Sequence, residues 1–139
     1  MSDHPKRIVI DTNTLVSAFL WPDSLPGRAL DKALLEGSLL VSAATLAELE
    51  GVLKRDKFDK YVPLEERLAL LATFRAVGIS VAIRETVTEC RDPKDDKFLD
   101  VAINAKVDAI VTGDKDLLAL HPFRGIAIIK ARTFVEGSV

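Results

Sequence analysis

The feature that most constrains this chain is a short apolar run that ends on an acid. Ile8, Val9 and Ile10 are consecutive β-favouring residues, and Asp11 follows them directly. A strand that is apolar on both sides is typical of a parallel sheet with both faces covered. Such folds place their ligands at the carboxyl ends of the strands, where Asp11 would lie. Because an Asp after a strand also commonly caps the next helix, this residue alone leaves both interpretations open.

Further apolar runs recur along the chain and alternate with helical patterns. Further strands are expected at Leu39–Val41, Ile79–Ile83, Ala109–Val111 and Ile126–Ile129. Of these, the strand at Ile79–Ile83 is expected to lie nearer an edge of the sheet. Helical patterns occupy Thr14–Leu20, Arg28–Glu36, Ala43–Arg55, Leu64–Val77, Asp92–Lys106, Asp114–Leu118 and Arg132–Glu136. Strands that alternate with helices imply right-handed crossovers and a parallel sheet. The sequence therefore predicts an α/β fold, a single three-layer α/β/α domain over residues 1–139 with a central, mostly parallel five-stranded sheet.

Composition narrows the range of partners and compartments. The 139 residues are 48% hydrophobic and 29% charged, as in an ordinary globular protein. Because the formal net charge is only −2, a nucleic acid would have to be held by a local patch or by metal ions. Cys90 is the single cysteine, so no intrachain disulfide forms and a reducing compartment fits best. The polar start and the lack of a run of about 18 apolar residues predict a cytoplasmic protein without a signal peptide or membrane span.

Other acids occur at positions equivalent to that of Asp11. Glu48 lies early on the Ala43–Arg55 helix, Asp96 lies in the first turn after Asp92, and Asp114 follows a strand. Each has an ordinary explanation as a solvated residue, a helix cap or a partner of the helix dipole. At one sheet edge, however, four carboxylates repel one another unless a cation neutralises them. Oxygen ligands without His or Cys suit Mg²⁺ or Mn²⁺, which could activate water for attack on a phosphoryl group.

Other chemistries find less support in the sequence. The glycines form neither G-x-G-x-x-G nor G-x-x-x-x-G-K-[ST], so there is no nucleotide-binding loop of either kind. His4 and His121 stand in a polar terminal stretch and before a proline, which disfavours a zinc site or a catalytic triad. Trp21 could stack a base, although covering the edge of the core is the simpler interpretation. The Lys54–Lys60 cluster could track a phosphate backbone or form a solvated helix end.

Ordered motifs along the chain carry a family resemblance. They are Ile8–Ala18, Leu46–Leu53, Cys90–Leu99 and Ile110–Leu118. On these motifs the chain, from Arg7 to about Glu136, resembles PIN-domain proteins and, more narrowly, the toxin components of toxin–antitoxin systems. The resemblance implies a metal-dependent endoribonuclease that uses Mg²⁺ or Mn²⁺ to hydrolyse RNA phosphodiester bonds. It also implies a cognate antitoxin as partner and permits a homodimer.

The same resemblance assigns roles to individual residues. It implies that Asp11, Asp96 and Asp114 coordinate metal, directly or through water, and that Glu48 orients an attacking water. Asp100 lies one helical turn after Asp96 and is a second candidate for the third ligand. The residues expected to support these acids are Asn13, Thr112 and Asp116.

Two alternative functions are weighed against the nuclease. A haloacid-dehalogenase-type phosphatase also uses an Asp after its first strand, but it needs a second acid two residues later, where this chain has Asn13. A catalytically silent PIN-fold binding module is the non-enzymatic alternative. Four carboxylates that repel one another have no use in a site kept only for binding, so the sequence favours the enzyme.

Overall fold

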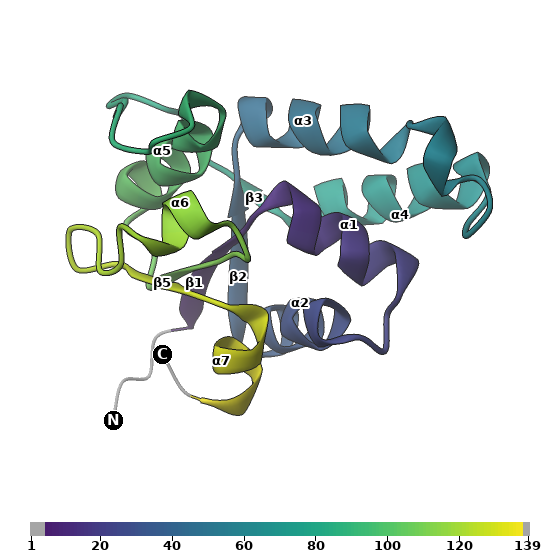
Figure 1. The fold of residues 1–139 in the computed structure, drawn as a ribbon, viewed down its shortest axis with the longest axis horizontal. Helices are drawn as coiled ribbons and strands as arrows, with labels where there is room; N and C mark the ends of the chain where they lie inside the picture. Colours follow the sequence, from purple (N-terminus) through teal and green to yellow (C-terminus); the bar gives the residue numbers. More distant parts are fainter. Residues whose placement is uncertain (1–4, 138–139) are drawn as a thin grey trace.

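Five parallel strands form the centre of the molecule (Figure 1). A computed structural model of the chain describes residues 5–137. The strands lie side by side in the order β3-β2-β1-β4-β5. Their bounds are β1 Lys6–Ile10, β2 Gly37–Val41, β3 Ile79–Ser80, β4 Ala109–Val111 and β5 Ala127–Ile129. The predicted α/β fold is thereby confirmed, with every pairing parallel. β3 is the short edge strand, since it pairs only with Leu40 and Val41 of β2.

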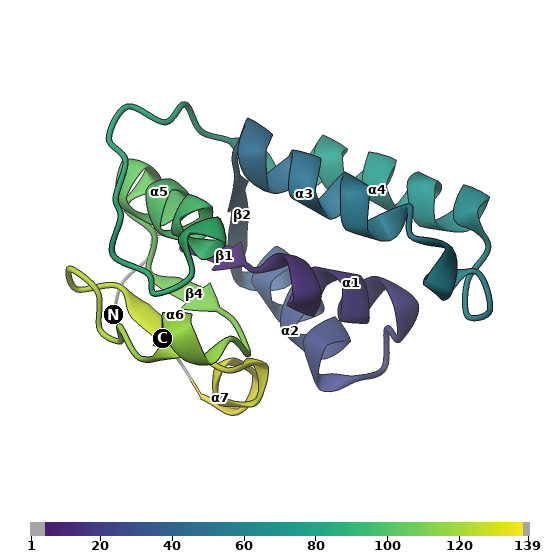
Figure 2. The same cartoon turned by 45° about the horizontal axis from the view of Figure 1, so that its top comes forward.

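Helices cover both faces of this sheet (Figures 1 and 2). Their bounds are α1 Thr12–Leu20, α2 Leu25–Glu36, α3 Ala43–Leu53, α4 Leu64–Val77, α5 Asp96–Ala105, α6 Lys115–Leu118 and α7 Ala131–Glu136, with 3-10 turns η1 Asp56–Phe58 and η2 Pro93–Asp95. One buried cluster joins α1, α2, α3, α4 and α7 to the sheet, and a second joins α5 and α6 to the opposite face. No helix within residues 5–137 combines the length and the apolar character needed to cross a membrane.

The central strand shows why the apolar run is apolar on both sides. Ile8 and Ile10 pack into the cluster beneath α1 to α4, whereas Val9 packs into the cluster beneath α5. All three side chains are at most 5% exposed. Burial of each such side chain stabilises the fold by about 1.5–3 kcal/mol. Because side chains alternate between the two faces of a strand, each residue of this run is buried in one core cluster or the other.

The strand order puts a topological switch point between β1 and β4. From β1 the chain moves through β2 to β3, then crosses back to place β4 on the other side of β1. Ile10 is paired with Val111, and the backbone N–H of Asp11 donates to the carbonyl of Val111 at 3.1 Å. The residues after both strands consequently emerge together at one edge, where open α/β sheets form their ligand crevice.

The start of α3 carries Glu48 toward the same edge. Ser42 follows β2, and its hydroxyl accepts the N–H of Thr45, whose own hydroxyl accepts the N–H of Ser42. This reciprocal capping fixes the point at which the helix begins. Leu49 and Leu53 face the core and are at most 1% exposed. Glu48 is half-buried and lies at the margin of the buried face of α3, about one turn from both Thr45 and Val52.

Candidate active site

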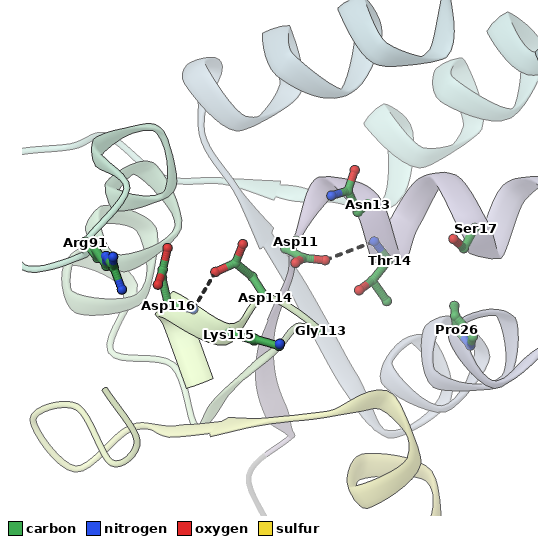
Figure 3. A pocket seen from close by; sticks show the side chains of 10 residues that line it. All are labelled: Asp11, Asn13, Thr14, Ser17, Pro26, Arg91, Gly113, Asp114, Lys115 and Asp116. Carbon is green, nitrogen blue, oxygen red and sulfur yellow. Dashed lines mark hydrogen bonds between the residues drawn. The ribbon is translucent and has the colours of Figure 1, made fainter. Parts of the chain in front are cut away.

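Two adjoining cavities lie at the carboxyl edge of the sheet, and both are lined by Asp11, Asn13 and Asp114. The first cavity has a volume of about 730 Å³ and extends past Ser17 toward Pro26. Figure 3 shows the side chains that line it, with Asp11 and Asp114 at the ends of their strands. The second cavity has a volume of about 250 Å³ and is lined further by Thr12, Glu48, Arg55, Asp92, Lys94 and Asp95. The structure thus brings three of the four predicted acids, Asp11, Glu48 and Asp114, around one continuous space.

A buried threonine joins two of these acids. The Thr112 hydroxyl donates to Oδ2 of Asp11 at 2.5 Å and accepts the backbone N–H of Asp114 at 3.0 Å. Thr112 is 1% exposed and Asp11 is 5% exposed. The other oxygen of Asp11 accepts the N–H of Thr14 at 2.9 Å and so caps α1. Asp11 is therefore a helix cap, as one of the two interpretations predicts, and its carboxylate also lines both cavities.

Asp114 has a similar double position at the start of α6. Its Oδ1 atom accepts the N–H groups of Asp116 and Leu117, at 2.8 Å and 3.2 Å. Both bonds go to the same oxygen. The carboxylate lines both cavities, and Figure 3 shows it in the first. The Asp116 side chain lines the first cavity beside it. The turn after β4 thus fixes Asp114 with one of its two oxygens.

Glu48 is held by two donors from different elements. Its Oε1 atom accepts the Thr12 hydroxyl at 2.5 Å, and its Oε2 atom accepts the Lys97 ammonium at 2.7 Å. The Glu48 and Lys97 side chains are 30% and 21% exposed, so the ion pair is partly shielded from water. Sequence reasoning missed Lys97. Only the fold could reveal it, because the two partners are 49 positions apart along the chain.

Asp95 is the acid from the start of α5 that lines the second cavity. Its pKa is raised to about 6, chiefly by burial and then by the charges of Asp114 and Asp92, with a further contribution from Glu48. The positive charge of Lys97 opposes this rise. The raised pKa reflects first the partial removal of this carboxyl group from water and second the like charges near it. The sequence indicates Asp95 only weakly, through its position directly before Asp96, which is the residue expected to coordinate metal.

Asp96 and Asp100 instead hold the loop that precedes α5. Oδ1 of Asp96 accepts the N–H of Cys90, and Oδ1 of Asp100 accepts the N–H of Val87, both at 2.8 Å. Neither side chain lines either cavity. Burial raises the pKa of Asp100, although its bond from Val87 lowers it. The structure thus does not bring the expected third acid, or its predicted substitute, into the space shared by the others.

The local helix geometry explains why the neighbouring acids differ. The predicted helix from Asp92 begins as the 3-10 turn η2, and the α-helix proper starts only at Asp96. Asp92 caps that turn by accepting the N–H of Lys94 at 3.0 Å. Successive residues of a helix point about 100° apart, since 3.6 residues complete a turn. Asp95 and Asp96 therefore face different surroundings, and a sequence pattern that is uncertain by one residue cannot separate them.

The remaining side chains of the cavities are Asn13 and several cations. Asn13 is exposed and lines both cavities, and within residues 5–137 no hydrogen bond joins it to an acid. Arg91 and Lys115 line the first cavity, whereas Arg55 and Lys94 line the second. Positive charges therefore flank the carboxylates on both sides, as a phosphate backbone would require. Cys90 is buried, and this burial raises the pKa of its thiol, which argues against a reactive cysteine.

The acidic side chains are of the type that a hard divalent cation prefers, but their positions in the structure do not form a coordination shell. Carboxylates alone line the second cavity as anionic ligands, which fits Mg²⁺ or Mn²⁺. The negative charges that contribute to the raised pKa of Asp95 repel one another, and a bound cation would reduce this repulsion. Within residues 5–137, however, no three Asp, Glu, His or Cys side chains lie close enough together to hold a metal ion.

Comparison with known proteins identifies the class. The fold and the crevice define an α/β domain with an acidic site at its topological switch point, and the PIN domain family matches residues 7–116. The chain belongs to the PIN domain family. It is 36% identical over 117 residues to the uncharacterized protein MJ1680 of Methanocaldococcus jannaschii, covering 83% of this chain and 75% of that protein.

Solved structures share the fold at low sequence identity. One is the crystal structure of VapBC2 from Rickettsia felis bound to a DNA fragment from their promoter, with a TM-score of 0.62 and 16% identity. That match covers 88% of this chain and 96% of the other. A second is FitAcB from Neisseria gonorrhoeae, with a TM-score of 0.58, 23% identity and coverage of 90% and 98%. At these identities the likeness establishes the PIN-like fold.

Proposed function

We propose that this PIN-domain protein is a metal-dependent endoribonuclease, the toxin of a toxin–antitoxin pair. The observation that carries the proposal is the set of hydrogen bonds in which Thr112 joins Asp11 to Asp114 beside Glu48. The family supports a nuclease, and the structural neighbours VapBC2 and FitAcB support an antitoxin as partner. The cavities and their flanking cations suit an RNA phosphodiester as substrate.

Asp11 and Asp114, with an acid from the start of α5, would hold Mg²⁺ or Mn²⁺. A divalent ion bound there polarises a phosphoryl oxygen and neutralises the charge that develops in the transition state. Thr112 keeps the Asp11 carboxylate in one orientation and prevents Asp114 from turning away, through the bond to its backbone. Preorganisation of this kind is the contribution of the protein to phosphoryl transfer.

Glu48 serves in this proposal as the group that orients and deprotonates the attacking water. Thr12 and Lys97 each occupy one oxygen of its carboxylate. Because each carboxylate oxygen has two lone pairs, a water can still donate to Glu48. The attacking oxygen then bonds to phosphorus as its proton passes to Glu48, and the leaving oxygen departs on the opposite side. The two donors fix the direction from which that water approaches.

Two residues compete for the place of the third acid. The resemblance to the family favours Asp96, whereas the lining of the second cavity favours Asp95. We propose Asp95, because its carboxylate lines the second cavity with Glu48 and Asp114, whereas Asp96 lines neither cavity. Asn13 and Asp116 remain supporting residues in the proposal by virtue of their positions on the cavity walls.

The experiment that tests the proposal is cleavage of a mixed pool of structured and single-stranded RNAs. The wild type is compared with Asp11→Asn, each with Mg²⁺, with Mn²⁺ and with EDTA. Asp31→Asn is the matched control, since it removes an exposed charge on α2 outside both cavities. Cleavage that needs metal, is lost in Asp11→Asn and persists in Asp31→Asn is the expected result. Equal cleavage by all three proteins, or cleavage in EDTA, would overturn the proposal.

A further inference from the structure

Two half-exposed aromatic rings meet beyond the candidate active site. Trp21 caps the C-terminal end of α1, and Tyr61 follows η1 in the connection between α3 and α4. Their ring centroids are 5.2 Å apart with an interplanar angle of 65°. The two residues remain 47% and 51% exposed although they touch each other. Large aromatic side chains normally bury most of their area, so two adjacent exposed rings indicate a contact surface.

One lysine lies against the Tyr61 ring, and a second lies close by in the sequence. The Lys60 ammonium lies 5.1 Å from the centroid of Tyr61, and the Lys57 ammonium lies 5.2 Å from the centroid of Phe58. In the part of the chain that the structure describes, neither ammonium forms a salt bridge with a carboxylate. We call Trp21, Tyr61, Lys57 and Lys60 the aromatic–basic patch. The two ammonium groups are thus free of direct pairing within the described residues, although Asp56 and Asp59 interrupt the cluster in sequence.

A fully buried arginine holds the connection that carries this patch. Arg67 is 0% exposed, and its guanidinium donates to the carbonyls of Leu53, Arg55 and Val62 at 2.5–3.0 Å. The same group also donates to the Asp59 carboxylate. A buried cation is costly unless its donors are all used, so this network keeps the connection in one conformation. The patch is therefore preorganised, which lowers the entropy lost on binding.

Two segments of the chain connect the patch to the candidate active site. Arg55, whose carbonyl accepts from Arg67, lines the second cavity together with Glu48. On the other side, α1 (Figure 1) has Asp11 as its N-cap and Trp21 as its C-cap. At 1.5 Å per residue this separation is about 15 Å. An extended nucleic acid strand with one phosphate at the acids can thus reach the patch within a few nucleotides.

We propose that the aromatic–basic patch is a stacking platform for bases of single-stranded RNA on one flank of the scissile phosphate. Exposed faces of Trp21 and Tyr61 would stack bases, while Lys57 and Lys60 would contact the phosphates. Aromatic stacking accepts any base, so this platform selects unpaired RNA without reading its sequence. The inference rests on the proposed function, because RNA is the substrate that places a strand across both surfaces.

Trp21 is the single tryptophan of the chain, so its fluorescence reports directly on the patch. The Asp11→Asn variant, which would bind without cutting, is titrated with an oligouridylate about 12 nucleotides long and with a duplex of the same length. We expect saturable quenching by the single strand and little by the duplex. Adding Tyr61→Leu should weaken binding about tenfold, and adding Lys60→Met should weaken its dependence on salt. Leu35→Ala and Lys106→Met, at exposed sites elsewhere, are the matched controls.

The possible outcomes separate this inference from the nuclease itself. Lys60→Met leaves the core untouched, so an effect of that variant cannot be attributed to misfolding. Unchanged Trp21 fluorescence at saturating RNA, or equal affinities for Tyr61→Leu and Leu35→Ala, would overturn the platform even if the wild type cuts RNA. Quenching of Trp21 by a protein partner but not by RNA would also overturn it. Quenching by RNA in a protein that never cleaves would support the platform and refute the nuclease.

Discussion

The ammonium of Lys97 and the carboxylate of Glu48 form a 2.7 Å ion pair between α5 and α3 at the second cavity. This pair links the two sides of the crevice, because α3 follows β2 and α5 precedes β4. Glu48 would otherwise be one more negative charge beside Asp95 and Asp114. The protein thus supplies part of the neutralising charge of its acidic site from its own chain.

Replacement of Lys97 by Met should show whether Lys97 positions Glu48 for catalysis or contributes to the binding of RNA. Loss of the ion pair frees Glu48 to rotate, so we expect kcat for RNA cleavage to fall about tenfold to a hundredfold with little change in KM. Lys97→Arg should restore most of the rate. The control is Lys94→Met, which removes an exposed lysine from the same cavity wall. Equal losses in Lys97→Met and Lys94→Met would show that only the net charge matters.

The raised pKa of Asp95 predicts how stability depends on pH in the absence of metal. The pKa is about 6 in the folded protein against 3.8 as the ordinary value, so the fold favours the protonated form. This stabilisation is complete below about pH 4 and is lost as the pH rises through about 6. Urea unfolding in EDTA should therefore give a falling free energy of unfolding over this range. In Asp95→Asn that part of the decline should be absent, and an unchanged pH profile would contradict the crowding of acids.

A comparison of Asp95 with Asp96 should identify the third acid. If Asp95 serves, Asp95→Asn loses metal-dependent cleavage, whereas Asp96→Asn keeps an oxygen that can accept from Cys90 and stays active. Asp96→Ala removes that acceptor, and the free energy of unfolding should fall by about 1–3 kcal/mol. Cleavage assays and urea titrations of the three variants check this. Full activity of Asp95→Asn with loss in Asp96→Asn would return the role to Asp96.

Binding of Mn²⁺ should stabilise the folded protein only if the acids hold it. At a concentration about 100-fold above Kd, binding to the folded state should raise Tm by about 10 °C. The rise should vanish in a double variant of Asp11→Asn and Asp114→Asn and persist in Asp31→Asn. Differential scanning calorimetry with Mn²⁺ and with EDTA measures it. A Tm that is indifferent to Mn²⁺ would favour the silent binding module over the nuclease.

The buried guanidinium of Arg67 predicts a large loss of stability from a conservative change. Lys cannot reproduce its bonds to the carbonyls of Leu53, Arg55 and Val62. Arg67→Lys should therefore lower the free energy of unfolding by about 3–5 kcal/mol, because it leaves a buried charge and buried carbonyls short of partners. Arg75→Lys, at an exposed position on the same helix, should change it by less than about 1 kcal/mol. Urea unfolding of the two variants provides the comparison.

Much of this fold could be predicted because local patterns and tertiary demands agree. Helix α4 has the predicted bounds, Leu64–Val77, since Pro63 and Gly78 stop it at both ends. The burial of Ile8, Val9 and Ile10 on two faces also follows from an apolar run without alternation. The expected strand at Ile79–Ile83 shortened to two residues, because its edge position leaves the later residues without a partner strand.

The candidate site was harder to predict, because its details depend on contacts distant in sequence. Asp11 and Asp114 could be found as acids that follow buried strands. The choice between Asp95 and Asp96 depends on the 3-10 turn, which shifts the helix phase by an amount that no hydrophobic pattern records. The partners of Glu48, and the contact of Trp21 with Tyr61, appear only once the fold has placed separate elements together.

Strands β1 and β4 are neighbours in the sheet but lie far apart in the sequence, so the candidate site is completed late in synthesis of the chain. Asp11 leaves the ribosome before Thr112, its hydrogen-bond partner 101 positions later in the chain. A nascent chain that has not yet emerged beyond β4 lacks both Thr112 and Asp114, so it holds Asp11 without the rest of the crevice. The proposed cleavage of RNA would therefore require synthesis of the chain at least as far as Asp114.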